Sequence, residues 1–258
     1  MQDWQDHRQV WLERVAKIAR AAGALVLEVY ATDFSVRGKH DQSPVTEADE
    51  RAENLIVGAL QALAPAVPII AEEAVAAGQV PRIGALFWLV DPLDGTKEFI
   101  SRNGEFTVNI ALIADGVPVL GVVFAPALDR LFAGDVQLGA WLENSTGRHP
   151  IRCREVPEAG LTVVASRSHG DAAALDAFLA GRKVAALASA GSSLKLCLIA
   201  AGEADLYPRL GRTMEWDIAA GHAVLAAAGG TVTDLHGAPL RYGKPGFENP
   251  HFVAAAVG

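Results

Sequence analysis

Apolar residues recur at alternating intervals of four and three along residues 11–29, which is the period of an α-helix with one buried face. A second helical pattern covers residues 52–63, and Thr46 and Asp49 stand before it with the spacing of an N-terminal capping box. Pro65 ends this pattern, because a proline inside a helix removes a backbone hydrogen bond. We therefore expect two amphipathic helices at the start of the chain, each with one face packed against the rest of the protein.

Short apolar runs at residues 67–71 and 86–90 each lead directly into acidic residues. Their length and the turn residues around them predict buried strands that deliver carboxylates at their ends. The next three runs are separated by turn-forming residues, as in an antiparallel meander: 106–113, 117–124 and 130–133. Trp141 is expected to extend that sheet.

Near residue 150 the pattern changes to strands that alternate with helices, which predicts a second α/β layer. The expected strands cover residues 161–165, 184–187, 204–207 and 231–235. The expected helices cover residues 171–180, 192–201 and 216–228. The fold class is therefore α/β (α+β), in two tightly packed halves, residues 1–150 and 151–258.

The composition is that of a globular protein with little affinity for polyanions. Hydrophobic residues make up 51% of the 258 positions and charged residues 20%, which allows a sizeable core. The formal net charge is −8 and the basic residues are scattered, so we expect no nucleic-acid partner. A phosphate substrate would then need local positive charge, which a metal ion held by carboxylates supplies.

The cysteines and the N-terminus give information on the cellular compartment of the protein. Cys153 and Cys197 lack the spacing of a disulfide framework or a zinc site. The N-terminus has neither the basic stretch nor the apolar run of a signal peptide, and no apolar stretch reaches the length of a membrane span. We expect a protein without an integral membrane segment, located in the cytoplasm or peripherally at the inner membrane.

The segment after residue 90 carries the most informative chemistry. Asp91 and Asp94 leave an apolar run three residues apart, and Gly95 permits a close backbone approach in the turn that follows. This spacing can place both carboxylates and the Leu93 carbonyl around a hard cation, which prefers oxygen ligands. The backbone N–H groups of Gly95 and Thr96 would stand at a helix start, where phosphate binds well.

The run Asp-Pro-Leu-Asp-Gly-Thr at residues 91–96 resembles the signature of the inositol monophosphatase superfamily, whose members are lithium-sensitive, Mg²⁺-dependent phosphatases. Three further elements resemble motifs of that family in the same chain order: residues 44–49, 72–73 and 216–221. The resemblance covers most of the chain. It implies the layered α-β-α-β-α sandwich of the inositol monophosphatase type.

Within the superfamily, residues 94–99 and 103–110 are most similar to the 3'(2'),5'-bisphosphate nucleotidases of the CysQ type. Three later stretches have the same similarity: 166–169, 191–195 and 206–209. This resemblance implies hydrolysis of the 3'-phosphate of adenosine 3',5'-bisphosphate, a small-molecule nucleotide, to AMP and phosphate.

The resemblance also implies roles for individual residues. Two or three Mg²⁺ ions would be held by Glu72, Asp91, the Leu93 carbonyl, Asp94 and Asp217. Asp49 and Thr96 would orient and deprotonate the attacking water, and Glu73 would act beside them or as a further metal ligand. The substrate contacts would be Gly95, Thr96, His169, Ser193, Lys195 and Arg209. The first half would thus carry most metal ligands, and the second half Asp217 and the contacts to the nucleotide.

Simpler interpretations stay open for single residues. An isolated acid is more often a surface charge or a helix cap than a metal ligand. A cap alone explains Thr46 and Asp49, and Asp217 can stabilise the N-terminus of its own helix. His169, taken alone, is more often a hydrogen-bonded structural histidine.

Two other functions also stay open. An inositol monophosphatase or sugar phosphatase of the same superfamily would share the metal core. A non-catalytic regulatory protein on the same fold is the second alternative, and the intact acids at positions 49, 72, 91, 94 and 217 weigh against it. A monomer or a homodimer is the expected assembly.

Overall fold

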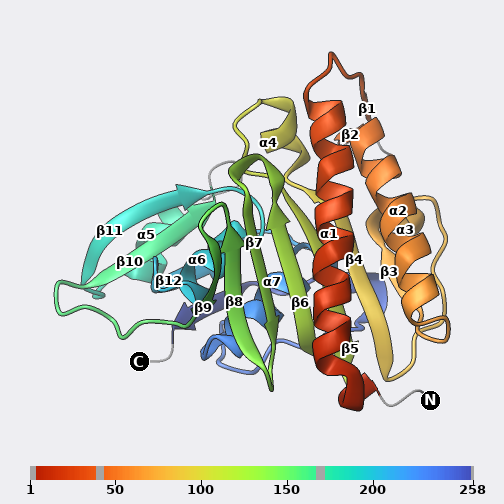
Figure 1. Ribbon diagram of the computed structural model, residues 1–258. Coiled ribbons are helices and arrows are strands. Elements are labelled where there is room, and N and C mark those ends of the chain that lie inside the picture. The colour runs from red at the N-terminus through yellow and green to blue at the C-terminus, as the bar shows by residue number, and fades with distance from the viewer. Residues whose placement is uncertain (1–3, 39–43, 167–171, 257–258) are drawn as a thin grey trace.

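Two sheets and the helices around them make up the computed structural model, which describes residues 4–38, 44–166 and 172–256. The first long helix is α1 (Arg8–Tyr30), preceded by the short turn η1 (Trp4–His7). The second is α2 (Glu47–Leu63), which begins at the predicted capping box of Thr46 and Asp49. Figure 1 shows α1 and α2 side by side across one face of the larger sheet. Both predicted helices are therefore confirmed.

The larger sheet has seven strands in the order β3-β4-β5-β6-β7-β8-β9. Their bounds are Ile69–Ala71, Leu86–Asp94, Thr107–Ala114, Val117–Ala125, Arg130–Asp135, Gly139–Asn144 and Gly147–Ile151. β3 pairs with β4 in parallel, and the remaining neighbours are antiparallel. The predicted meander is confirmed, and β8 contains Trp141. The edge strand β9 was not predicted, because its exposed, polar sequence has no buried face.

The smaller sheet has five strands in the order β11-β10-β12-β14-β13. In chain order, β10 to β14 span Leu161–Ser166, Val184–Ala190, Leu206–Arg209, Gly230–Asp234 and Phe252–Ala256. The helices of this part are α5 (Ala172–Leu179), α6 (Leu194–Ala200) and α7 (Glu215–Ala227). Short elements complete the chain: β1 (Val36–Gly38), β2 (Pro44–Thr46), α3 (Glu72–Ala76), α4 (Thr96–Ile100), η2 (Pro126–Leu128) and η3 (Pro245–Phe247). The predicted alternation of strands and helices is confirmed, and β14 is an additional strand.

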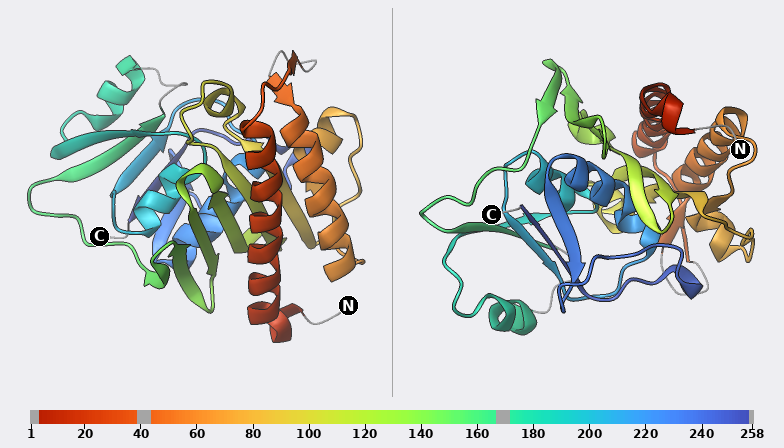
Figure 2. Two further views of the ribbon diagram at one scale, coloured as in Figure 1. Left: turned by 45° about the horizontal axis from the view of Figure 1, so that its top comes forward. Right: turned by 90° about the horizontal axis from the view of Figure 1, so that it is seen from below.

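Five layers result from this arrangement. α1 and α2 cover the outer face of the seven-stranded sheet, and α6 and α7 lie between the two sheets (Figure 2). α5 lies on the far side of the five-stranded sheet (Figure 2). α7 approaches the larger sheet very closely, since a Cβ at Gly121 would stand 2.3 Å from the Ala220 carbonyl oxygen. The α-β-α-β-α sandwich is therefore confirmed.

The division into halves at residue 150 stays a prediction. α7 packs against both sheets, and one hydrophobic core contains residues of both. In the part of the chain that the structure describes, no helix combines the length and the apolar character that crossing a membrane requires.

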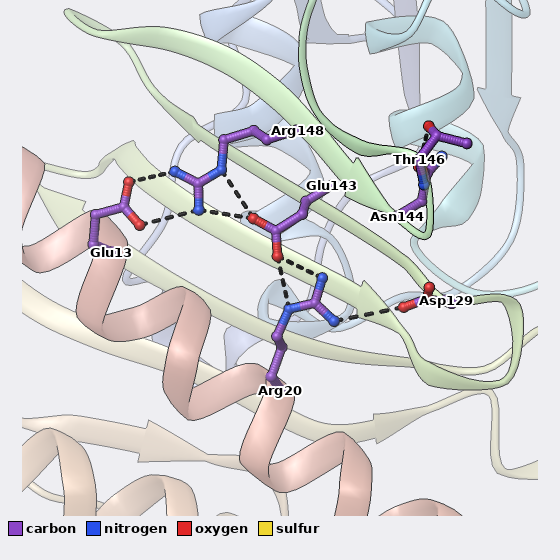
Figure 3. A network of polar contacts seen from close by, with 7 residues as sticks. All are labelled: Glu13, Arg20, Asp129, Glu143, Asn144, Thr146 and Arg148. Carbon is purple, nitrogen blue, oxygen red and sulfur yellow. Dashed lines mark hydrogen bonds and ion pairs between the residues drawn. The ribbon is translucent and has the colours of Figure 1, made fainter.

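A network of charged side chains holds the outer strands of the larger sheet against α1 (Figure 3). Arg148 of β9 pairs with Glu13 of α1 and donates from Nε to Glu143 Oε2 of β8 at 2.9 Å. Arg20 of α1 donates to the other oxygen of Glu143 and also pairs with Asp129. Partial burial alone would raise the pKa of Glu143, but the bonds and charges of Arg148 and Arg20 outweigh it and lower that pKa. The network thus favours an ionised Glu143 in the folded state.

We expect Arg148→Met to lower the free energy of unfolding by about 1 kcal/mol, because partly exposed ion pairs contribute amounts of this order. The Arg148 guanidinium also lies over the Trp141 ring, so the change removes a cation–π contact together with the ion pairs, while methionine keeps an unbranched apolar side chain. Urea denaturation at low salt and at high salt measures the effect, which should shrink at high salt. Arg14→Met, at an exposed arginine of α1 outside the network, is the control. Equal losses in both variants would contradict the assigned role of the network.

Candidate active site

The end of strand β4 places two acids inside the protein. β4 is buried along most of its length, and the exposed fraction of Asp91 is only 2%. Between Asp91 and Asp94 the pairing with β5 slips, because Asp91 lies opposite Asn109 and Asp94 lies opposite Thr107. The extra β4 residue forms a bulge, which redirects the side chains on either side of it. The Leu93 N–H closes the turn by donating to Asp91 Oδ1 at 3.0 Å.

Glu72 reaches the same place from strand β3. Ala71 is paired with Val90 in the parallel ladder, so Glu72 follows at the level of Asp91. The two side chains share a hydrogen bond, and burial together with the charges of Glu72, Asp94 and Asp217 raises the pKa of Asp91 well above its ordinary value. The structure therefore brings Glu72 and Asp91 together, as the sequence predicted.

Asp217 joins this group from the first turn of α7. Burial and the charges of Asp94 and Glu72 raise its pKa well above the ordinary value. Its Oδ2 also accepts the Met214 N–H at 2.8 Å, so Asp217 caps α7 while it faces the other acids. Asp217 therefore both caps its helix and belongs to the group of acids. We call Glu72, Asp91, Asp94 and Asp217 the carboxylate cluster.

Asp94 is held by two neutral residues, Asn109 of β5 and Ser193 of the second half of the chain. Its Oδ2 accepts the Ser193 N–H at 2.7 Å and the Asn109 Nδ2 amide at 3.3 Å. Ser193 Oγ and Asn109 Nδ2 also donate to the Asp217 carbonyl oxygen, at 2.8 Å and 3.4 Å. Burial raises the pKa of Asp94 to about 6, and Lys195 and these donors oppose that rise. Ser193 and Asn109 thus hold two members of the cluster at a fixed distance from each other.

Asp49 and Thr96 meet at the start of α4. Asp49, with an exposed fraction of 1%, accepts the Thr46 N–H at 2.8 Å, which confirms its part in the cap of α2. Its other oxygen faces Thr96 Oγ1 at 3.5 Å, and the Leu93 carbonyl lies 3.4 Å from the same hydroxyl. Because one carboxylate serves both the cap and Thr96, the cap interpretation does not exclude the catalytic one.

Backbone geometry at Gly95 matches the predicted turn. Gly95 has φ +90° and stands at the N-cap of α4. A Cβ there would lie 3.3 Å from the Glu105 carbonyl oxygen and 3.4 Å from Ser192 Cβ. Gly191 approaches the same Glu105 carbonyl, and its N–H donates to the Glu105 carboxylate at 2.9 Å. The segments that contain Gly95 and Glu105 are therefore packed directly on the loop that contains Gly191 and Ser192.

The remaining predicted substrate contacts lie around this loop. Lys195 has an exposed fraction of 4% and donates through Nζ to the Ala190 and Ser192 carbonyl oxygens at 3.2 Å and 2.6 Å. Burial lowers the pKa of Lys195 to about 8, although Asp94 opposes this. Arg209 ends β12, and its buried Nε has no hydrogen-bond partner among the described residues. His169 lies outside the described residues.

The donor set suits a hard divalent cation. Besides burial, the charges of Glu72 and Asp94 raise the pKa values of Asp91 and Asp217, so a bound positive charge favours the ionised acids, and the Leu93 carbonyl adds an oxygen ligand. Asn109 Oδ1 is buried without a hydrogen-bond partner in the described structure. Within residues 4–38, 44–166 and 172–256, no three His, Cys, Asp or Glu side chains already converge on one cation position. The fit to Mg²⁺ therefore rests on the chemistry of these oxygen donors, since Mg²⁺ commonly completes its shell with water and substrate phosphate.

Sequence reasoning missed three residues of this site. Asn109 and Glu105 connect the halves, and Glu53 of α2 accepts backbone N–H groups of α3. A polar residue within the apolar run 106–113 was a usable signal for Asn109. Glu53 stands four residues after Asp49, on the same face of α2, which was the signal available for it.

Comparison with known proteins identifies relatives along the whole chain. The model of the inositol monophosphatase family matches residues 7–256. The 3'(2'),5'-bisphosphate nucleotidase CysQ of Escherichia coli is 47% identical over 244 residues, which cover 93% of this chain and 98% of that protein. The protein of the same name from Buchnera aphidicola is 42% identical, with coverage of 95% and 94%.

Solved structures give the same result. The crystal structure of CysQ from Bacteroides thetaiotaomicron has a TM-score of 0.81 and 37% identity, and the match covers 96% of this chain and 97% of that one. An inositol monophosphatase from Anabaena has a TM-score of 0.76 and 27% identity, with coverage of 96% and 91%.

We expect Asp94→Asn to stabilise the metal-free protein at pH 7.5 by about 1–2 kcal/mol, because it removes an ionised carboxylate from the cluster. The folded-state pKa of Asp94 is raised to about 6, so its ionised form destabilises the fold above that pH. The gain should therefore shrink as the pH falls through 6 and vanish near pH 4. Asparagine keeps an oxygen for the Ser193 N–H.

Urea denaturation in the presence of a chelator at pH 7.5 and at pH 5 measures this difference. Asp115→Asn, at an exposed hairpin residue with φ +51° that asparagine tolerates, is the control. The assignment of Asp94 to a repelling cluster is wrong if the variant is less stable than the parent protein at both pH values.

Proposed function

The chain belongs to the inositol monophosphatase family, and from this premise we propose that it is a Mg²⁺-dependent phosphatase acting on adenosine 3',5'-bisphosphate. It hydrolyses the 3'-phosphate and gives AMP and phosphate. Relatives that are 47% identical along nearly their whole length are named 3'(2'),5'-bisphosphate nucleotidases. The single observation that carries the chemistry is the carboxylate cluster, whose acids come from α3, β4 and α7.

The cluster supplies the metal-holding oxygens in this proposal. The ligands are Glu72, Asp91, the Leu93 carbonyl, Asp94 and Asp217, and we propose two or three ions among them. Mg²⁺ bound there supplies positive charge for the phosphate oxygens and for the oxygen that leaves. Phosphate monoester hydrolysis needs such charge stabilisation, because the uncatalysed reaction is extremely slow. Glu73 takes a secondary place beside Glu72.

Asp49 and Thr96 provide the path for the proton. The Thr96 hydroxyl faces Asp49 Oδ1 and donates to it, so a lone pair of Thr96 Oγ1 can orient the attacking water. The water oxygen attacks phosphorus, its proton moves through Thr96 to Asp49, and the bond from phosphorus to the 3' oxygen breaks. That oxygen leaves with a proton from solvent. Asp49 keeps its position during this step, because Thr46 also holds it.

The substrate contacts are proposals as well. The N–H groups of Gly95 and Thr96 face the reacting phosphate, while Ser193, Lys195, Arg209 and His169 serve the rest of the nucleotide. Lys195 and Arg209 bring positive charge toward Asp94 and Asp217. A doubly phosphorylated substrate needs such positive charge, because the chain as a whole has a net negative charge. A monomeric or homodimeric assembly and a location in the cytoplasm or peripherally at the inner membrane stay predictions.

An inositol monophosphatase or sugar phosphatase is the second candidate, because the metal-holding acids do not depend on the organic part of the substrate. A solved inositol monophosphatase at 27% identity shares the fold. The higher identity to the nucleotidases favours the nucleotide. A non-catalytic protein is disfavoured, because every acid of the cluster is present and buried or half-buried.

We expect Mg²⁺-dependent phosphate release from adenosine 3',5'-bisphosphate, with kcat/KM at least about tenfold above that for inositol monophosphate. A phosphate-release assay on both compounds, with Mg²⁺ and with a chelator, measures this. Asp94→Asn should be inactive and Asp115→Asn unchanged, since only the first removes a charged ligand of the cluster. Equal or faster turnover of inositol monophosphate would overturn the nucleotide assignment, and no release from any substrate would favour the non-catalytic alternative.

Thr96→Val should lower kcat by about 100-fold, because it removes the hydroxyl that relays the proton while keeping a side chain of similar size. Thr96→Ser keeps the hydroxyl and is the matched variant, which should retain most of the activity. Steady-state kinetics of both enzymes at saturating Mg²⁺ measure the difference. Equal activity of the valine and serine variants would show that the hydroxyl takes no part in the reaction.

A further inference from the structure

The helix that carries Glu72 and Glu73 begins without a cap of its own. α3 (Glu72–Ala76) follows directly on β3, and its N-cap residue is Ala71. The first N–H groups of a helix have no acceptor inside the helix and usually bond to a Ser, Thr, Asp or Asn side chain at the N-cap. Alanine has no side-chain oxygen. The first turn of α3 therefore needs an acceptor from elsewhere in the protein.

Glu53 of α2 is that acceptor. Its Oε2 accepts the Glu73 N–H at 2.7 Å and its Oε1 accepts the Ala74 N–H at 2.8 Å. Both oxygens of one carboxylate are thus used on two successive N–H groups, 20 and 21 residues further along the chain. Bonds from N–H groups to a carboxylate are stronger than neutral ones, and the exposed fraction of Glu53 is only 8%.

Packing holds α3 only in part, because Ala74 and Val75 lie against the hydrophobic cores but stay partly exposed, so these two bonds also matter for its position. Each of the five residues of α3 is partly or fully exposed. The carboxylate of Glu72 nevertheless has to meet Asp91, with which it shares a hydrogen bond. The peptide unit between Glu72 and Glu73 is fixed from one side by the β3–β4 ladder and from the other by Glu53.

α2 supports both acid-bearing segments through one face. Asp49 and Glu53 are four residues apart, one helical turn, and both are buried. Asp49 reaches Thr96 at the end of β4, and Glu53 reaches the residues after β3. A single rigid helix thereby sets the relative position of two chain segments whose acids belong to the same cluster.

We propose that Glu53 is a positioning residue that fixes Glu72 for metal binding through the backbone of α3. The inference rests on the proposed function, because it takes Glu72 as a metal ligand. Glu53 itself touches neither the metal nor the substrate. Partners that orient a metal ligand typically affect metal affinity by about 10–100-fold, and a loss of this size is expected when both bonds are removed.

The experiment compares three variants of the full chain with the parent protein. Glu53→Ala removes both acceptor oxygens, and Glu53→Gln leaves one acceptor in a side chain of the same shape. Ile56→Val is the control, because Ile56 is fully buried on the same helix and its truncation costs about 0.5–1.5 kcal/mol of stability while leaving both Glu53 bonds to α3 in place. Binding of Mn²⁺, a paramagnetic stand-in for Mg²⁺, is titrated by electron paramagnetic resonance, and amide exchange is followed in the peptide covering residues 69–80.

We expect Glu53→Ala to weaken Mn²⁺ binding by about 10–100-fold and Glu53→Gln to weaken it less, with Ile56→Val within about twofold of the parent. The amides of Glu73 and Ala74 should exchange faster in Glu53→Ala, even without metal. Saturating Mg²⁺ should restore part of the lost phosphatase activity.

Mn²⁺ affinity in both Glu53 variants within twofold of the parent would overturn the inference while leaving the proposed function standing. An equal loss in Ile56→Val would also overturn it, because the effect would then be one of general stability. A parent protein that binds no Mn²⁺ would instead defeat the proposed metal site itself. Should Glu53→Ala fail to fold, the glutamine variant alone decides, through its Mn²⁺ affinity and the exchange of the Glu73 amide.

Discussion

Mutual repulsion among buried carboxylates is the constraint that the rest of the structure has to satisfy. Asp91 and Asp217 both have strongly raised pKa values, and each is raised in part by other members of the cluster. Acids in this situation would move apart or protonate unless the surrounding backbone fixed their positions. The protein meets this constraint with neutral donors: the Leu93, Ser193 and Met214 N–H groups each hold one acid.

The layered fold explains how the acids can come from distant parts of the chain. Closely packed α7 brings Asp217 against the larger sheet, and Gly121 allows the helix to approach within backbone contact. On the opposite face, α2 reaches the ends of β3 and β4 through two buried acids, Asp49 and Glu53. The cluster is thus held between two helical layers, so rigid elements rather than loops set the spacing of its members.

The sequence could predict features that depend on local pattern, but it gave little information on features that depend on tertiary contacts. The periodicity of α1 and α2, the capping box, and the positions of the acids at the end of β4 are local features, and they were predicted correctly. β9 and β14 were missed, because the first is exposed and polar and the second is mostly alanine. The supporting roles of Glu53 and Asn109 depend on which backbone lies beside them after folding, and spacing along the chain gives only a weak sign of that.

Under the proposed function, stability and catalysis are opposed at this site, because the same charges affect both. A carboxylate whose folded-state pKa is raised to about 6, as at Asp94, lowers the stability of the metal-free protein at neutral pH. In the proposed function, a divalent cation would remove that cost by favouring the ionised form, so the groups that destabilise the metal-free site would be those that hold the metal. Asn109 and Ser193 limit the cost without neutralising the acids, because amide and hydroxyl donors carry no charge. A lysine or arginine at either position would stabilise the metal-free fold but would compete with the cation, which is a physical reason for neutral residues there.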